Sequence, residues 1–279
     1  MDVTAKNLQD FRVWMLERGR SEGTADLYIT NIKTCAADKR GMTARLVGGK
    51  LAPNTLRLNL ASLRAWARFT EDVKMQRRLA DIRLPAARRV TSKPPLELEQ
   101  WRKVVAHLQT CKMDEAMRQV LLIMALRGMR SGDVLRMTKA EVQRAVDTGK
   151  LIYEGKGRKR IEFSAKPLMA PLRALAAMPG WSRVRDLIAE RPSTAKLKVW
   201  RCSRRTAKQV GIKEMNPHRY RHTFATNYLK QLAGDPNAII KLQKYMAWES
   251  MSTAARYVDS VSQDQLDVVG DELIGDLLR

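Results

Sequence analysis

Residues 216–229, NPHRYRHTFATNYL, place His218, Arg221 and His222 at positions i, i+3 and i+4. In a helix these three side chains project from nearly one face. Pro217 suits the first turn, where its missing N–H costs nothing and where the free N–H groups favour a bound phosphate. The segment therefore predicts a helix start that could present an imidazole and a guanidinium to one anion. On its own this spacing is more typical of a structural role.

Other stretches of the C-terminal half carry residues with chemistry that suits a phosphate. Arg130 lies in GMRSGDVLRM (128–137) and Lys156 in GKGRKR (155–160), while MAWESMSTAARYV (246–258) contains Trp248 and Tyr257. Cations and neutral hydrogen-bond donors can surround one phosphate, and a phenol can attack it. Together the residues predict metal-free chemistry on a nucleic-acid backbone.

These stretches resemble, in their order and spacing, the tyrosine recombinase (phage integrase-like, Cre/Xer-like) family. HRYRHTFAT is similar to the family's His-x-x-Arg-His box, and GMRSGDVLRM to its first arginine box. The first lysine of the GKGRKR hairpin and the nine residues from Trp248 to Tyr257 also match the family pattern. Residues 16–28 and 52–69 resemble its core-binding domain, so the likeness covers nearly the whole chain.

The resemblance implies a site-specific DNA recombinase, such as the integrase or resolution enzyme of a mobile element, that cleaves and rejoins strands through a 3′-phosphotyrosyl intermediate. Neither a metal ion nor a cofactor is expected. The resemblance also implies the residues that stabilise the phosphate, protonate the leaving group and attack. These residues are Arg130, Lys156, His218, Arg221, Trp248 and, as nucleophile, Tyr257. Two rivals remain: a type IB topoisomerase, and a non-catalytic DNA-binding regulator of the same fold.

Some positions depart from the family pattern or leave a choice. Asp133 replaces the usual Glu, and as a buried carboxylate it could orient Arg130. Most members have His at the position of Trp248, but an indole N–H can also donate to a phosphate oxygen, or the ring could be mainly core. Lys159 shares a turn with Lys156 and is an alternative acid. His222 is expected to hold its helix rather than to transfer a proton.

The composition indicates a polyanionic partner. The chain has 279 residues and a formal net charge of +23, and residues 1–94 already contain 19 basic against 9 acidic side chains. Charge of this size in both halves drives binding to phosphate backbones through counterion release, so double-stranded DNA is the expected partner. Charge alone is equally consistent with a protein that coats nucleic acid without chemistry.

Cysteine usage and hydropathy predict the cellular setting. Cys35, Cys111 and Cys202 are widely separated, with no CxxC pair and no His at metal-ligand spacing. The N-terminus has no apolar signal core, and no run of about 18 apolar residues could span a membrane. We therefore expect a reduced, soluble, cytoplasmic and nucleoid-associated protein without structural zinc.

The expected fold is mainly α, with two domains. Residues 1–83 predict a helical bundle, with two helices joined near Gly19–Gly23 and a third beginning at Pro53. Residues 84–95, LPAARRVTSKPP, have the composition of an extended basic linker. Residues 96–279 predict an α+β catalytic domain in which a β-hairpin, forming a small antiparallel sheet, is followed by helices over about 167–189, 196–210, 217–232 and 236–246.

Candidate DNA contacts and an assembly segment complete the prediction. Arginines on the Pro53 helix and in the linker are the expected backbone contacts: Arg57, Arg64, Arg68, Arg88 and Arg89. The resemblance implies a homotetramer on two synapsed sites that exchanges one strand pair at a time through a Holliday junction, with accessory DNA-bending proteins as possible partners. Apolar residues at helical spacing between Leu266 and Leu278 predict a terminal helix that docks either on a neighbouring subunit or on its own domain.

Overall fold

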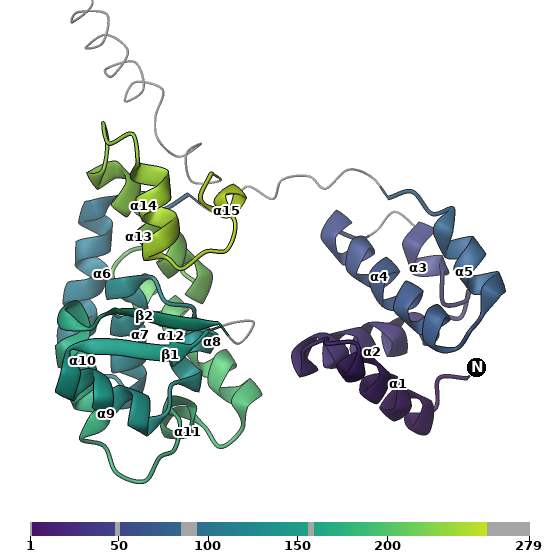
Figure 1. Cartoon of the computed structure of the whole chain (residues 1–279), viewed down its shortest axis with the longest axis horizontal. Coiled ribbons are helices and arrows are strands. Elements are labelled where there is room, and N and C mark those ends of the chain that lie inside the picture. The colour runs from purple at the N-terminus through teal and green to yellow at the C-terminus, as the bar shows by residue number, and fades with distance from the viewer. Residues whose placement is uncertain (1, 48–50, 85–93, 156–158, 256–279) are drawn as a thin grey trace, which may run out of the picture. The chain divides into compact units, whose positions relative to one another are not determined.

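The computed structural model describes residues 2–47, 51–84, 94–155 and 159–255 (Figure 1). The chain divides into two compact units, residues 1–92 and 93–279. This division lies within the stretch 84–95 that the sequence predicts as a linker. Among the described residues, no helix is both long and apolar enough to cross a membrane.

The N-terminal unit is a helical bundle, as predicted. Ser21 caps the second helix by accepting a hydrogen bond from Thr24 N, and Pro53 occupies the first turn of the fourth. An aromatic cluster lies between the helices, with the Phe11 and Trp66 rings 5.3 Å apart. The helices are α1 (Ala5–Glu17), α2 (Glu22–Ala36), α3 (Ala44–Val47), α4 (Pro53–Phe69) and α5 (Val73–Ala80).

The second unit is built around α7 (Glu115–Arg127), which is buried over most of its length because its sequence, VLLIMAL, is apolar on every face. Helices from both the early and the late part of this unit's sequence pack against α7 (Figure 1). The others are α6 (Leu98–Thr110), α8 (Ser131–Arg136), α9 (Lys139–Thr148), α10 (Met169–Ala176), α11 (Val184–Ile188), α12 (Pro192–Gln209), α13 (Pro217–Gln231), α14 (Ala238–Tyr245) and α15 (Met251–Ala255).

The predicted hairpin is confirmed. Strands β1 (Lys150–Glu154) and β2 (Arg160–Ser164) pair antiparallel, with Lys150 opposite Ser164 and Glu154 opposite Arg160. Gly155 N donates to Lys159 O at 2.8 Å and continues the pairing toward the turn. This two-stranded sheet is the only one among the described residues, and the described architecture is mainly helical, as expected.

The prediction of one continuous helix over about 167–189 is wrong, because this stretch is interrupted. The chain forms a short 3₁₀ turn (Lys166–Leu168), then α10, then a non-helical stretch before α11. Pro179 has no N–H to donate and Gly180 adopts φ +72°, so the helix ends at this dipeptide. The terminal helix predicted over 266–278 lies outside the described residues.

Candidate active site

The helix that begins at Pro217 is capped by its preceding residue. Asn216 Oδ1 accepts hydrogen bonds from the backbone N–H groups of His218 and Arg219, both at 2.9 Å. An asparagine cap followed by proline defines the start of α13 sharply. His218 and Arg221, one turn apart on this helix, therefore line the same pocket.

Arg221 is buried and its orientation is fixed by two carbonyl groups. Its Nη1 donates to Gly128 O at 2.8 Å and its Nη2 donates to Met246 O at 3.0 Å. Gly128 adopts φ +64°, and a Cβ there would lie 3.0 Å from the Phe224 side chain. A glycine is thus required at the end of α7 for α13 to approach this closely.

Arg130 lies at the start of α8 beside a buried carboxylate. Its Nη1 is 3.6 Å from Asp133 Oδ2, and only 3% of the Asp133 side chain is exposed. Arg136 donates to the other Asp133 oxygen. Asp133 therefore lies between two guanidinium groups and restrains Arg130, whose side chain remains 35% exposed.

These residues line one open pocket of about 530 Å³. Three helices contribute to it, with Arg130 and Asp133 from the start of α8, Lys196 and Trp200 from α12, and His218 and Arg221 from α13. The structure thus brings together three of the predicted catalytic residues and the predicted orienting carboxylate. Three arginines line this cavity, Arg130, Arg136 and Arg221, so the pocket suits a phosphate group.

Lys196 and Trp200 were not identified from the sequence. They lie four residues apart on α12, and the Trp200 ring is 40% exposed with the Arg204 guanidinium 4.8 Å from its centroid. The sequence gives one hint, because the buried stripe of α12 contains Ala195 and Val199 and leaves Trp200 beside it. An exposed tryptophan next to lysine and arginine is a typical nucleic-acid contact.

The pKa of His218 is lowered from its ordinary value. The main cause is partial desolvation by surrounding atoms, and the positive charges of Arg221 and Arg130 add to it. The imidazole is accordingly neutral near pH 7 and able to accept a proton.

A buried tyrosine shares the same electrostatic environment. Burial, with a smaller contribution from Asp133, raises the pKa of Tyr153 to about 12. Tyr153 therefore stays protonated at neutral pH.

Trp248 is 6% exposed and packs in an apolar cluster with Leu242, Met246 and Ala254. Its ring centroid is 5.3 Å from Arg221 Cζ. Trp248 is therefore both a core residue and a neighbour of Arg221. It lines the protein side of Arg221 rather than the pocket described above.

His222 lies outside the pocket lining and is half-buried. Its Nδ1 is 3.2 Å from Thr226 Oγ1 one turn further along α13, and desolvation lowers its pKa. This contact agrees with the expectation that His222 holds its own helix.

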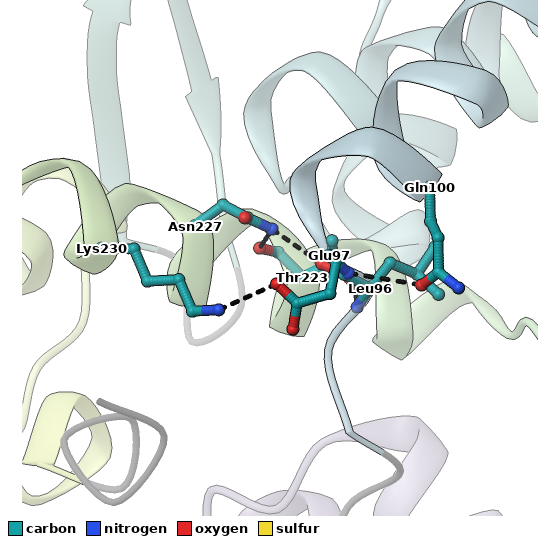
Figure 2. A network of polar contacts seen from close by, with 6 residues as sticks. All are labelled: Leu96, Glu97, Gln100, Thr223, Asn227 and Lys230. Carbon is teal, nitrogen blue, oxygen red and sulfur yellow. Dashed lines mark hydrogen bonds and ion pairs between the residues drawn. The ribbon is translucent and has the colours of Figure 1, made fainter. Parts of the chain in front are cut away.

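The other side of α13 is attached to the segment that leads into α6 (Figure 2). Leu96 N donates to Thr223 Oγ1 at 3.0 Å, and Asn227 Nδ2 donates to Leu96 O at 3.0 Å. Lys230 forms a 3.0 Å ion pair with Glu97. The helix that carries His218 and Arg221 is therefore held on both sides.

Four of the predicted residues lie outside the described residues: Lys156, Tyr257, Arg88 and Arg89. Their roles stay predictions. Lys159, the alternative acid, is described at the base of the hairpin turn, where it is half-buried.

The predicted DNA contacts of the N-terminal unit line a second arginine-rich pocket, of about 670 Å³. Trp14 and Tyr28 contribute aromatic walls. Arg64 also donates to Leu79 O at 2.8 Å, which joins α4 to the end of α5. The arginines of this pocket are Arg18, Arg20, Arg57, Arg64 and Arg68.

The sequence model of the phage integrase family matches residues 95–264. No curated protein matches the chain.

Solved structures share the fold at low sequence identity. A lambda integrase dimer bound to a COC′ core site has a TM-score of 0.64 and 17% identity, covering 92% of this chain and 77% of that one. A Tn1549 transposon integrase in complex with transposon right end DNA has a TM-score of 0.61 and 15% identity, covering 96% and 99%. The XerH recombinase bound to a palindromic difH substrate has a TM-score of 0.60 and 16% identity, covering 91% and 80%.

Proposed function

Since the chain belongs to the phage integrase family, we propose that it is a site-specific tyrosine recombinase that cleaves and rejoins DNA strands. The observation that carries the proposal is that Arg130, His218 and Arg221 line one cavity, where their donors suit a phosphate. DNA is the partner that agrees with the net charge of +23 and with the DNA bound in the similar structures.

In the proposed reaction the Tyr257 hydroxyl attacks the scissile phosphorus and forms a 3′-phosphotyrosyl ester. The 5′-oxygen leaves with the electron pair of the broken P–O bond and takes a proton from Lys156, or from Lys159 if that residue is the acid. Religation reverses these steps, and the phosphodiester energy is retained in the ester.

The described residues have distinct roles in this scheme. Arg130 and Arg221 stabilise the added negative charge of the pentacoordinate state with planar donors that stay protonated. Neutral His218 accepts the phenol proton or binds a phosphate oxygen. Trp248, which lies outside the pocket lining, acts through Arg221, whose Cζ lies 5.3 Å from the centroid of its ring.

The arginine pocket of the N-terminal unit is proposed to bind the DNA backbone, together with Arg88 and Arg89 of the linker. Trp200 and Lys196 extend the contact beyond the scissile phosphate. Four protomers on two synapsed sites are the proposed assembly, with residues 266–278 docking on a neighbouring subunit.

Covalent trapping tests the function. The DNA is a nicked suicide substrate built on a site that the protein selects from random DNA, and adducts are resolved on a denaturing gel. Wild type should form a covalent adduct and Tyr257→Phe should not. Tyr228→Phe, which removes the hydroxyl of a partly exposed tyrosine, serves as the matched control and should react normally.

The same assay separates the rivals. Absence of any adduct on selected sites would make the chain a non-catalytic DNA-binding member of the family. Relaxation of any supercoiled plasmid by a monomer, without synapsis of two sites, would favour the topoisomerase reading.

A further inference from the structure

Three charged side chains are buried among the described residues: Asp133, Arg221 and Arg127. The first two belong to the candidate active site. Arg127 is the last residue of α7, is 5% exposed and has no ion-pair partner among the described residues. A buried cation without a carboxylate costs free energy unless other groups compensate it, so its surroundings need explanation.

The compensation comes from two aromatic rings and a carbonyl group. Arg127 Cζ is 3.6 Å from the centroid of the Tyr245 ring and 4.2 Å from that of Phe163. Its Nη2 donates to Tyr245 O at 2.5 Å. The guanidinium therefore contacts both β2, which follows the hairpin turn, and the carboxyl end of α14. Burial lowers the pKa of Arg127, yet an arginine stays charged in such a site.

Arg127 and Arg221 bind consecutive carbonyl groups. Arg127 binds Tyr245 O and Arg221 binds Met246 O, at the end of α14 where helix carbonyls lack intrahelical partners. Two cations also oppose the negative end of the helix dipole. The next residue, Ala247, adopts φ +51°, and Trp248 follows it.

From this geometry we infer that Arg127 is a positioning residue for strand cleavage. It holds the carboxyl end of α14 against the hairpin, and thereby fixes both Met246 O, which orients Arg221, and the segment that carries Trp248. The inference rests on the proposed function for its catalytic part. Its structural part, the restraint of residues 245–248, is independent of that function.

A purely structural role makes a different prediction. If Arg127 only fills the core, methionine of similar length should replace it without loss, because apolar residues often substitute for buried charges at no cost in stability. A positioning role instead predicts that Arg127→Met folds normally and cleaves slowly.

The test compares Arg127→Met, Arg127→Lys and the control Arg118→Met. Arg118 lies on the same helix but donates to Gln109 O and Glu115, away from the site. Thermal unfolding, DNA affinity and the single-turnover rate of adduct formation at saturating protein are measured for each. Amide hydrogen exchange of Met246, Ala247 and Trp248 is measured in the free proteins.

Arg127→Met should reduce the adduct rate by about 10- to 100-fold with unchanged DNA affinity, and should accelerate exchange at the three amides, whereas Arg118→Met changes neither. Relative to wild type at the same pH, Arg127→Lys should recover part of the rate at the lower pH values and lose it as pH rises, because a buried lysine has a lowered pKa.

An adduct rate in Arg127→Met that equals the control rate, or that falls only in proportion to unfolded protein, would overturn the inference. If wild type forms no adduct, the proposed function fails and the catalytic part falls with it. Hydrogen exchange then decides the structural part alone, since unchanged exchange in Arg127→Met overturns that part too.

Discussion

The two units of this chain each contain an arginine-lined pocket, and the two pockets are built differently. In the N-terminal unit Arg64 and Arg68 are exposed on α4, and of these two only Arg64 donates to a backbone carbonyl of the described residues, Leu79 O. In the second unit Arg221 is 6% exposed and bound to two carbonyl groups, while Arg130 is restrained by a buried carboxylate. Charge is enough for binding a flexible backbone, whereas chemistry on one phosphate requires donors whose geometry is fixed before substrate arrives.

The largest effect is expected from a substitution that removes the fixed geometry of Arg221 but keeps its positive charge. Arg221→Lys should reduce the single-turnover adduct rate by about 100- to 1000-fold, because lysine cannot bind Gly128 O, Met246 O and a phosphate with one planar group. DNA affinity, measured by fluorescence anisotropy, should change by less than about threefold. A parallel loss of affinity would mean that this pocket binds by charge alone.

His218 gives the next largest effect. His218→Gln should lower the adduct rate by about 100-fold, a typical contribution of a general base. In wild type the rate should stay level from pH 8 to about 6.5 and fall only below that, because desolvation and two arginines lower the pKa of His218 from its ordinary value of about 6.5. The rate is lost as pH falls because protonation removes the acceptor. A glutamine variant with the same acid limb would assign the limb to another group.

Removing one exposed arginine should have a smaller effect, on affinity. Arg68→Gln should weaken DNA binding about three- to tenfold and reduce the slope of log K against log salt by about one, with the adduct rate at saturation unchanged. Arg77→Gln, on α5 and outside the pocket, is the control and should change the affinity less. Equal losses in the two variants would mean that the pocket is no special binding site.

The smallest effect concerns backbone strain, present once in each unit among the described residues. Glu71 and Ala247 adopt φ +54° and +51°, so glycine at either position should stabilise the protein by about 0.5–1 kcal/mol in thermal or denaturant unfolding. Glu71→Gly should leave the adduct rate unchanged. Ala247→Gly should alter that rate, since it loosens the residue between Met246 and Trp248. Identical rates in the two variants would show that the strain at Ala247 has no role in cleavage.

Local patterns predicted much of this fold. The helix at Pro217 and the hairpin around residues 155–159 were predictable because proline, glycine and alternating apolar residues act within a few positions of themselves. The break at Pro179-Gly180 was missed because Met178, Trp181 and Val184 continue the apolar spacing across it. The dipeptide outweighs that spacing, since the missing N–H and the positive φ end the helix.

The sequence predicted which residues belong to the candidate site, but it did not predict how those residues are arranged. Arg130, His218 and Arg221 were identified from their local sequences. The geometry of the contact by which Asp133 restrains Arg130 became visible only in the structure. No sequence pattern indicated a role for Arg127, because its partners Phe163 and Tyr245 lie 36 and 118 positions away in the chain. Lys196 and Trp200 join the pocket only through the packing of α12 beside α8 and α13.

The attachment of Leu96 and Glu97 to α13 determines how this protein is to be divided into fragments (Figure 2). Leu98, the first residue of α6, looks like a natural place to begin a C-terminal fragment. A fragment beginning there would leave the buried Thr223 hydroxyl and the Asn227 amide without their Leu96 partners, on the helix that carries His218 and Arg221. Expression boundaries placed before Pro94, whose carbonyl accepts from Arg219 Nε, keep that helix whole.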